Sequence, residues 1–530
     1  MSTSTGRRRA GLLIPLFSCP STASWGIGDI GDVERLTAWM AAAGQRVLQL
    51  LPLNEMAPGQ QSPYSAISAM AIDPIFISVP LVAEFVALGG EASLTAEERE
   101  SLATVRHAPR IAFHAVRQLK HRALRASFER FLEKEWRGGS VRDRALQAYV
   151  NEQAWWLEDY GLFRALHARE RERPWMEWPE SLQRREPPAI DRARLELADE
   201  VLFQQYLQWI AGTQWQEARA QAHARGVALF GDLPFMVDGD SADVWVRQHQ
   251  FRLDLSVGAP PDAFSATGQD WGMPVYQWSA LAAEDYRWLR ERARRSADLF
   301  DGYRVDHLVG FYRTYGRAKS GGEGFFTPAD ESAQRALGET VLDMFRAAGA
   351  EIIAEDLGTV PDFVRASLAR MGIPGYRVFR WERHWHDEGR PFRDPSQYPP
   401  LSVAASGTHD TEPVAVWWDN AGEMERRQVS ELPSVQQVTA GADLTHRRFD
   451  ATVRDTLLEI LFAAASDLLL VPIQDAFGWR DRINEPATVG DVNWTYRLPW
   501  LVDTLDDVAE ARERKEALAA WSQRYGRLDG

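Results

Sequence analysis

The stretch Val227-Ala-Leu-Phe-Gly-Asp232 decides how the fold is interpreted, because it is a short apolar run that closes in a carboxylate. The same arrangement returns in Tyr303-Arg-Val-Asp306, Ile352-Ile-Ala-Glu355-Asp356, Ser406-Gly-Thr-His409-Asp410 and Val471-Pro-Ile-Gln-Asp475. Short runs rich in Val, Ile and Leu are typical of strands that are buried on both faces. We therefore predict a set of buried strands whose carboxyl ends carry acidic side chains.

The chain holds eight such runs, separated by longer segments with helical spacing. We predict strands over Leu12–Leu16, Arg46–Leu51, Val227–Asp232, Gly302–Asp306, Ala350–Glu355, Gly375–Arg380, Leu401–Ala405 and Leu468–Ile473. Strands that alternate with helices indicate a parallel α/β architecture. The predicted fold is an α/β (β/α)8 TIM barrel with helical insertions and no separate C-terminal β-domain. The carboxyl ends of its strands would meet on one face, where such barrels carry their chemistry.

We expect the barrel to occupy residues 11–500, between a flexible N-terminus of residues 1–10 and a C-terminal helix within residues 501–530 that packs on the barrel. A mainly helical insertion is expected around residues 90–225, where helical spacing replaces the strand runs. Thr95 is the predicted N-cap of a helix in this insertion, because acidic residues follow it. Pro187-Pro188 is expected to mark a loop there.

Composition excludes several classes of protein. Among the 530 residues, 75 acids outnumber 60 bases, and no long basic run exists, so we expect no nucleic-acid partner. No apolar run approaches the length of about 18 residues that a membrane span needs. The single cysteine, Cys19, excludes an intrachain disulfide and a multi-cysteine zinc site. We therefore expect a cytoplasmic protein. Its 21 tryptophans fit either a large core or flat surfaces that stack on sugar rings.

Three partial motifs are better explained without a cofactor or metal. Gly26-Ile-Gly28-Asp-Ile-Gly31 matches a dinucleotide-binding pattern, but a loop separates it from the preceding strand. Ala318-Lys319-Ser320 lacks the glycine of a phosphate-binding loop. His384-Trp-His386-Asp387 has no identifiable third metal ligand elsewhere, so we interpret it as a solvated turn.

The carboxylates at the strand ends fit the cleavage of a glycosidic bond, which needs one carboxylate as nucleophile and one carboxylic acid as proton donor. A single Asp after a strand most often caps the next helix, but five such ends with His and Arg neighbours favour an acidic cleft. Arg304 and Asp306 point the same way on a strand, and the guanidinium would keep Asp306 ionised. Glu355 follows an apolar run, where desolvation would raise its pKa. His307 and His409 could donate to sugar hydroxyls.

At these residues the chain resembles the 4-alpha-glucanotransferases of glycoside hydrolase family 77, the amylomaltases or disproportionating enzymes. The matching segments follow in order over about residues 10 to 500. They are Ser62-Pro-Tyr64-Ser-Ala-Ile-Ser68-Ala69, Gly231-Asp232-Leu-Pro-Phe235, Asp240-Ser-Ala-Asp-Val-Trp245, Pro260-Pro-Asp-Ala-Phe-Ser-Ala-Thr-Gly-Gln269-Asp-Trp271-Gly, Arg304-Val-Asp306-His307, Ala354-Glu355-Asp356-Leu-Gly358, Gly407-Thr-His409-Asp410, Gln474-Asp475 and Arg482-Ile-Asn484.

The resemblance implies a retaining transfer of an α-1,4-glucan segment, with Asp306 as nucleophile, Glu355 as general acid and base, and Asp410 as third carboxylate. It implies substrate-binding roles for Ser62, Tyr64, Asp232, Gln269, Trp271, Arg304, His307, Asp356, His409 and Asn484, although the pleat turns Asp356 away from Glu355. It implies no metal and no organic cofactor. The expected partners are a maltodextrin, starch or glycogen donor and a glucose or maltooligosaccharide acceptor.

Two alternatives stay open at this point: an α-1,4-glucan hydrolase of the amylase type, and a glucan-binding protein without turnover. Departures from the family pattern also leave acceptor preference, product length and loop shape open. Met273 and Thr411 stand where asparagine is usual, Arg380-Trp381-Glu382 belongs to a stretch that is usually more apolar, and Ala487 replaces a usual glycine.

Overall fold

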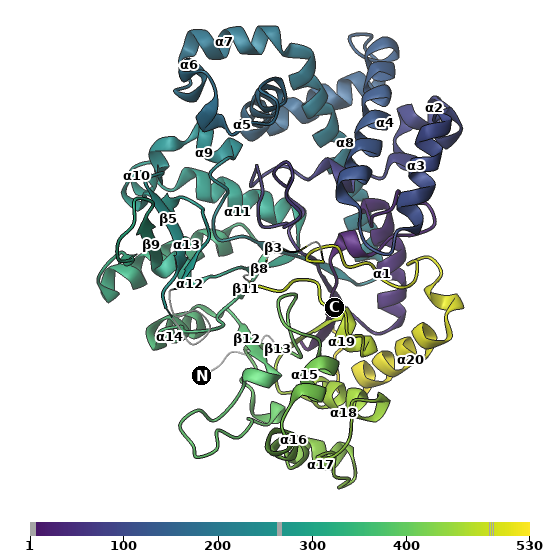
Figure 1. Ribbon diagram of the computed structural model, residues 1–530, viewed down its shortest axis with the longest axis vertical. Coiled ribbons are helices and arrows are strands. Elements are labelled where there is room, and N and C mark those ends of the chain that lie inside the picture. The colour runs from purple at the N-terminus through teal and green to yellow at the C-terminus, as the bar shows by residue number, and fades with distance from the viewer. Residues whose placement is uncertain (1–6, 262–267, 487, 489, 491, 530) are drawn as a thin grey trace.

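A closed barrel of eight parallel strands forms the centre of the molecule (Figure 1). The computed structural model describes residues 7–261, 268–486, 488, 490 and 492–529. The barrel strands are β1 (Arg9–Leu13), β2 (Val47–Gln49), β3 (Ala228–Leu233), β8 (Gly302–Val305), β11 (Glu351–Ala354), β12 (Gly375–Val378), β13 (Ser402–Ala405) and β14 (Leu468–Pro472). They follow one another around the barrel in chain order, and β14 closes it against β1. The predicted (β/α)8 barrel is confirmed, with a strand at each predicted position.

The first strand begins earlier than predicted. Arg9 pairs with Leu468 and Ala10 with Leu469 across the parallel β1–β14 ladder. The expectation of a flexible segment over residues 1–10 is therefore wrong for Arg9 and Ala10, because these ladder contacts hold them in the barrel. Residues 1–6 lie outside the described residues.

Alternate residues of the strands fill the interior of the barrel, because successive side chains of a strand point to opposite faces. The interior cluster consists of Val47, Phe230, Ile353, Tyr376, Val378, Val403, Ala405, Leu468 and Leu470. Two residues beyond Phe230 and Ile353 on the same face come Asp232 and Glu355. The packing of the barrel interior thus decides which strand-end side chains face the centre of the catalytic end.

A helical insertion lies between β2 and β3, and Figure 1 shows it gathered away from the barrel centre. Its helices are α2 (Ala83–Ala87), α3 (Ala96–His107), α4 (Phe113–Lys134), α5 (Val141–Arg169), α6 (Glu180–Gln183), α7 (Pro187–Glu196) and α8 (Ala198–Ala224). Thr95 caps α3 reciprocally with Glu98, as predicted. The expected loop at Pro187-Pro188 is wrong, because Pro187 opens α7, where a missing N–H costs nothing.

The remaining helices surround the barrel or stand in its loops. They are α1 (Val33–Ala42), α9 (Ala242–Val246), α10 (Trp278–Ala283), α11 (Arg287–Leu299), α12 (Val309–Tyr312), α13 (Glu331–Ala347), α14 (Asp362–Met371), α15 (Val414–Asn420), α16 (Glu423–Ser430), α17 (Pro433–Val438), α18 (Ala451–Phe462), α19 (Ile473–Phe477) and α20 (Ala509–Arg524). Helix α20 lies against α1 and α18. Of the helices in the described residues, none has both the length and the apolar character of a membrane span.

In the part of the chain that the structure describes, six short strands lie outside the barrel. They are β4 (Phe251–Arg252), β5 (Leu255–Ala259), β6 (Gln269–Asp270), β7 (Val275–Tyr276), β9 (Thr314–Ala318) and β10 (Phe325–Thr327). All of their pairings are antiparallel, and β5 links β6 to β9. The four-stranded sheet β10-β9-β5-β6 carries Gln269 and leads directly into Trp271, and β4 and β7 form a separate pair.

Candidate active site

Strand β8 places an arginine between two carboxylates. Arg304 is buried, and its Nη2 lies 2.8 Å from Oδ1 of Asp306. Its Nη1 donates to Oδ2 of Asp232 over 2.7 Å. Burial disfavours the charged guanidinium, but the carboxylates of Asp232 and Asp306 outweigh it and raise the pKa of Arg304. The predicted common orientation of Arg304 and Asp306 is confirmed, and a permanent positive charge holds Asp306 in place.

Glu355 stands at the end of β11 in an environment unlike that of Asp306. Burial raises the pKa of Glu355 to about 7; Arg304 opposes this shift, while the charge of Asp306 adds to it. Its Oε2 accepts a hydrogen bond of 2.8 Å from the backbone N–H of His307. The predicted effect of desolvation is confirmed. Near neutral pH this group can both give and take a proton, as a general acid and base must.

His307 occupies a backbone conformation that is unusual for a residue with a side chain, with φ of 43°. Such strained residues cluster at functional sites. Here the turn aims the backbone N–H at Glu355. Burial lowers the pKa of the His307 ring to about 4, and Asp306 only partly opposes it. The neutral ring meets Trp271 edge-on, with centroids 4.8 Å apart.

Tyr64 joins the barrel carboxylates to the loop after β13. Its hydroxyl donates to Oδ2 of Asp232 over 2.7 Å and lies 3.0 Å from Nε2 of His409. Burial raises the pKa of Asp232 to about 6, although Arg304 opposes the shift. Oδ1 of Asp232 is buried and has no hydrogen-bond partner among the described residues.

Asp410 is held as an anion by its neighbours. Burial disfavours its charge, but His409 and the amide of Asn484 outweigh burial and put the pKa of Asp410 far below its usual range. His409 Nε2 lies 3.2 Å from Oδ2 of Asp410, and Nδ2 of Asn484 donates to Oδ1 over 2.7 Å. Three of the predicted site residues therefore contact one another directly.

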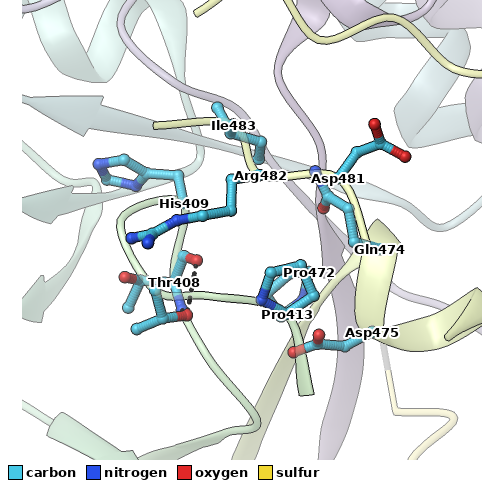
Figure 2. A pocket seen from close by; sticks show the side chains of 10 residues that line it. Thr408, His409, Pro413, Pro472, Gln474, Asp475, Asp481, Arg482 and Ile483 are labelled. Atoms are coloured by element: carbon cyan, nitrogen blue, oxygen red, sulfur yellow. Dashed lines mark hydrogen bonds between the residues drawn. The ribbon is translucent and has the colours of Figure 1, made fainter. Parts of the chain in front are cut away.

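Arg482 supports this arrangement from behind, a role that sequence analysis did not assign. Its Nη2 donates to the backbone oxygen of Asp410 over 2.8 Å, and its Nε to that of Asn484 over 3.2 Å. Figure 2 shows Arg482 beside His409 in a small pocket. Gln474 also lines this pocket, and neither polar atom of its buried amide has a partner among the described residues. The Arg482-Ile-Asn484 motif contained the signal that could have found Arg482.

Trp494 is a second residue that sequence analysis missed. Its ring lies 5.7 Å from that of Tyr64 and 5.8 Å from that of His409, measured between centroids. Its backbone has a φ of 63°, and its N–H donates to Ile483 over 2.7 Å. No sequence motif surrounds Trp494. It reaches the site through the conformation of a loop and not at the end of a strand.

Three further predicted residues lie around this centre. Ser62 Oγ accepts from the backbone N–H of Tyr64 over 3.3 Å, and Gln269 accepts from Nε1 of Trp271 over 3.0 Å. Asp356 is buried, and its carboxylate accepts from the backbone N–H of Tyr376 over 2.8 Å. This orientation agrees with the expectation that the pleat turns it away from Glu355. Among the described residues, no group of three or more His, Cys, Asp or Glu side chains could hold a metal ion.

The site can be compared with known proteins at this point. The family model described as 4-alpha-glucanotransferase, glycoside hydrolase family 77, matches residues 14–503. The chain belongs to the 4-alpha-glucanotransferase family. A 4-alpha-glucanotransferase of Chlamydia pneumoniae is 33% identical over 92% of this chain and 91% of its own length. One of Thermus thermophilus is 32% identical over 96% of this chain and 99% of its own length.

A solved structure agrees with these relatives. The amylomaltase of Streptococcus agalactiae, in complex with acarbose, superposes with a TM-score of 0.81 and 26% identity, over 98% of this chain and all of that one. The predicted membership of the 4-alpha-glucanotransferase family is confirmed, and the chain is an enzyme of that family. The hydrolase and the inactive binding protein are not favoured.

The departures from the family pattern can be located in part. Thr411 closes a turn in which its hydroxyl donates to the backbone oxygen of Thr408 over 3.0 Å. The backbone oxygen of Met273 accepts from Val257 over 2.8 Å, beside the Gln269 strand. Arg380 is buried, whereas Trp381 is exposed. Ala487 lies outside the described residues.

Proposed function

We propose that this 4-alpha-glucanotransferase moves a segment of an α-1,4-glucan to the 4-hydroxyl of an acceptor by a retaining double displacement. Asp306 is the nucleophile, and Glu355 is the general acid and then the base. The donor is a maltodextrin, starch or glycogen, and the acceptor is glucose or a maltooligosaccharide. The observation that carries the proposal is the contrast between Asp306, paired with Arg304, and Glu355, whose pKa burial raises to about 7.

In the first step, the Asp306 carboxylate attacks C1 of the donor while Glu355 gives its proton to the glycosidic oxygen. The bond to the leaving glucan breaks, and a covalent glucosyl ester on Asp306 forms. Arg304 supports this step, because its guanidinium contacts the attacking carboxylate and orients it. The hydrogen bond from His307 aims the carboxyl group of Glu355 and stabilises the carboxylate that remains.

In the second step, Glu355 takes the proton from the 4-hydroxyl of the acceptor, whose oxygen attacks C1 and releases Asp306. Two inversions leave the α configuration unchanged. Water would give hydrolysis by the same route, so transfer depends on a glucan that covers the reactive carbon. Trp271, edge-on to His307, is the proposed cover on this side of the site.

The other predicted residues are proposed to bind the distorted sugar. Asp410 holds hydroxyl groups as an anion, and Asp232 acts through Tyr64 and Arg304, which it contacts. The proposed substrate-binding set remains Ser62, Tyr64, Asp232, Gln269, Trp271, Arg304, His307, Asp356, His409 and Asn484. The acarbose in the amylomaltase of Streptococcus agalactiae supports a saccharide as the ligand. We also propose a cytoplasmic location, which the single cysteine supports.

The first experiment incubates the purified protein with maltotriose alone and follows chain lengths over time. Transfer gives glucose and a ladder of longer maltodextrins without a rise in total reducing ends. Glucose and maltose with rising reducing ends would contradict the proposed transfer. The Asp306→Asn variant is the control, because it keeps the fold and removes the nucleophile.

A further inference from the structure

Exposed tryptophans are concentrated in one loop of this protein. Among the tryptophans of the described residues, only Trp381 and Trp385 have exposed side chains, at 39% and 55% of their surface. They are four positions apart and follow the carboxyl end of β12, so they lie on the end of the barrel that carries the active site. The other tryptophans are buried or half-buried. The exposure of these two tryptophans in one loop therefore needs an explanation beyond the high tryptophan content of the chain.

Several contacts hold the base of the loop that presents Trp385. Arg383 and Phe392 form an antiparallel bridge at the base of the hairpin 383–392, and the Arg383 guanidinium lies 3.8 Å from the centroid of the Phe392 ring. Arg383 also pairs with Glu425 of α16 over 2.5 Å. The hairpin thus buries its own aromatic residue, Phe392, and leaves Trp385 outside.

The base of this loop is tied to the catalytic segment. Arg380 is buried, its Nη2 donates to the backbone oxygen of Ser406 over 3.4 Å, and its Nη1 lies 3.8 Å from Glu412. These two residues flank Asp410 in the sequence. Trp381 follows Arg380 directly, and Trp385 stands further out on the same loop. The base of the loop that carries the exposed rings is therefore joined to the segment that carries Asp410.

We propose that Trp385 is an outlying binding platform for an α-glucan chain, used by chains long enough to extend beyond the bond being cut. The flat indole offers an apolar face to the C–H face of a glucose ring. Arg390, 5.9 Å from the Trp385 ring centroid, and the neighbouring polar residues of the hairpin offer partners for its hydroxyls. The proposal rests on the proposed function, since it assigns further glucan contacts to the same reaction.

The test compares donors of different length. In Trp385→Ala we expect kcat/KM for maltoheptaose to fall about three- to tenfold, while kcat/KM for maltotriose stays within about twofold of the wild type. Trp385→Phe, which keeps a smaller ring, should retain an intermediate value. Met424→Ala is the matched control: Met424 is an exposed apolar side chain on α16, next to Glu425, but it has no ring to stack on a sugar.

Three results would overturn the platform. One is an equal loss for both donors, the second is no loss for either, and the third is a change of sedimentation coefficient in Trp385→Ala, which would assign the face to a protein contact. Binding of maltoheptaose to Asp306→Asn, with and without Trp385→Ala, is measured by calorimetry. This comparison needs no turnover, so failure of the platform can be told apart from failure of the proposed transfer.

Discussion

The two carboxyl groups that we propose as nucleophile and as general acid have different surroundings. Asp306 touches a guanidinium that two acidic side chains hold in charged form, whereas Glu355 has an apolar approach and one backbone donor. The sequence predicts both environments, because Arg304 lies two positions before Asp306 and apolar residues precede Glu355. The backbone donor from His307 could not be predicted, because it depends on a left-handed turn.

The pH dependence of the first half-reaction follows from Glu355. Protonation of the leaving oxygen needs the acid form, whose fraction falls about tenfold per pH unit above a pKa of about 7. We therefore expect kcat/KM for the donor to decline above about pH 7. Initial rates between pH 5 and 9 measure this limb. In Glu355→Gln the limb should vanish together with at least about 99% of the activity; a limb that persists would assign the titration to another group.

Asp306 and Asp356 should respond differently to substitution. Asp306→Asn should lower turnover at least about a thousandfold without lowering stability, because the nucleophile is lost and the fold is not. Asp356→Ala removes the acceptor of the Tyr376 N–H and should lower the free energy of unfolding by about 1–3 kcal/mol. Maltotriose turnover and urea unfolding of both variants measure the contrast. A fully stable Asp356→Ala would show that the buried bond contributes little.

At the scale of elements, helix α5 is joined to the loop after β3 by a histidine between two carboxylates. His167 is buried; its Nδ1 lies 2.8 Å from Glu172 and its Nε2 2.9 Å from Asp240. A neutral imidazole donates through one nitrogen only, so both contacts favour the protonated ring. Burial opposes the charge, but Asp240 and Glu172 outweigh it and raise the pKa of His167, despite Arg164.

The contacts of His167 with Glu172 and Asp240 should make the stability of the protein depend on pH. A histidine whose pKa is raised in the folded state stabilises the folded protein fully at pH values below its ordinary pKa of about 6.5. This stabilisation is lost as the pH rises through the pKa of the folded state. His167→Gln should therefore lower the melting temperature by about 2 °C at pH 5.5 and less at pH 9. Thermal unfolding at both pH values measures this. His114→Gln, at an exposed position on α4, is the control and should change neither.

Sequence patterns predicted the longer buried elements and the local capping signals, and they missed the very short paired strands. The barrel strands are buried apolar runs and Thr95 is a local capping signal, so both can be predicted from the sequence. Strand β6 covers only Gln269–Asp270 and pairs with β5 through Gly258 and Ala259. Such short pairs carry no periodicity, so they and the position of Trp494 depend on tertiary contacts that a single sequence does not display.

At the scale of the whole molecule, Arg527 near the C-terminus stabilises the seam of the barrel, which is the place where β14 pairs with β1. Its buried guanidinium donates to the backbone oxygens of Phe462, Ala464 and Ser466 before β14, and of Arg9 in β1. The distance between these residues in the chain explains why no sequence pattern predicts the contact. The sequence predicted a C-terminal helix that packs on the barrel, but it did not predict this contact of Arg527.

Removal of this contact should loosen the closure. Arg527→Ala leaves several buried carbonyl groups without donors, so we expect the free energy of unfolding to fall by about 2–4 kcal/mol. Urea unfolding followed by tryptophan fluorescence measures the loss. Arg524→Ala, which removes an exposed ion pair with Glu459, should cost less than about 1 kcal/mol. Equal effects of the two variants would show that the seam is not held by Arg527.

The peptide unit between Asp306 and His307 has a consequence for how this enzyme tolerates change. It follows the proposed nucleophile, Asp306, and its N–H donates to the proposed acid, Glu355. One peptide unit and one hydrogen bond therefore set the distance between the two reacting groups. Changes in distant loops should affect this distance little. Insertions and exchanges around the rim can alter which glucans fit, while the gap between attack and protonation stays the same.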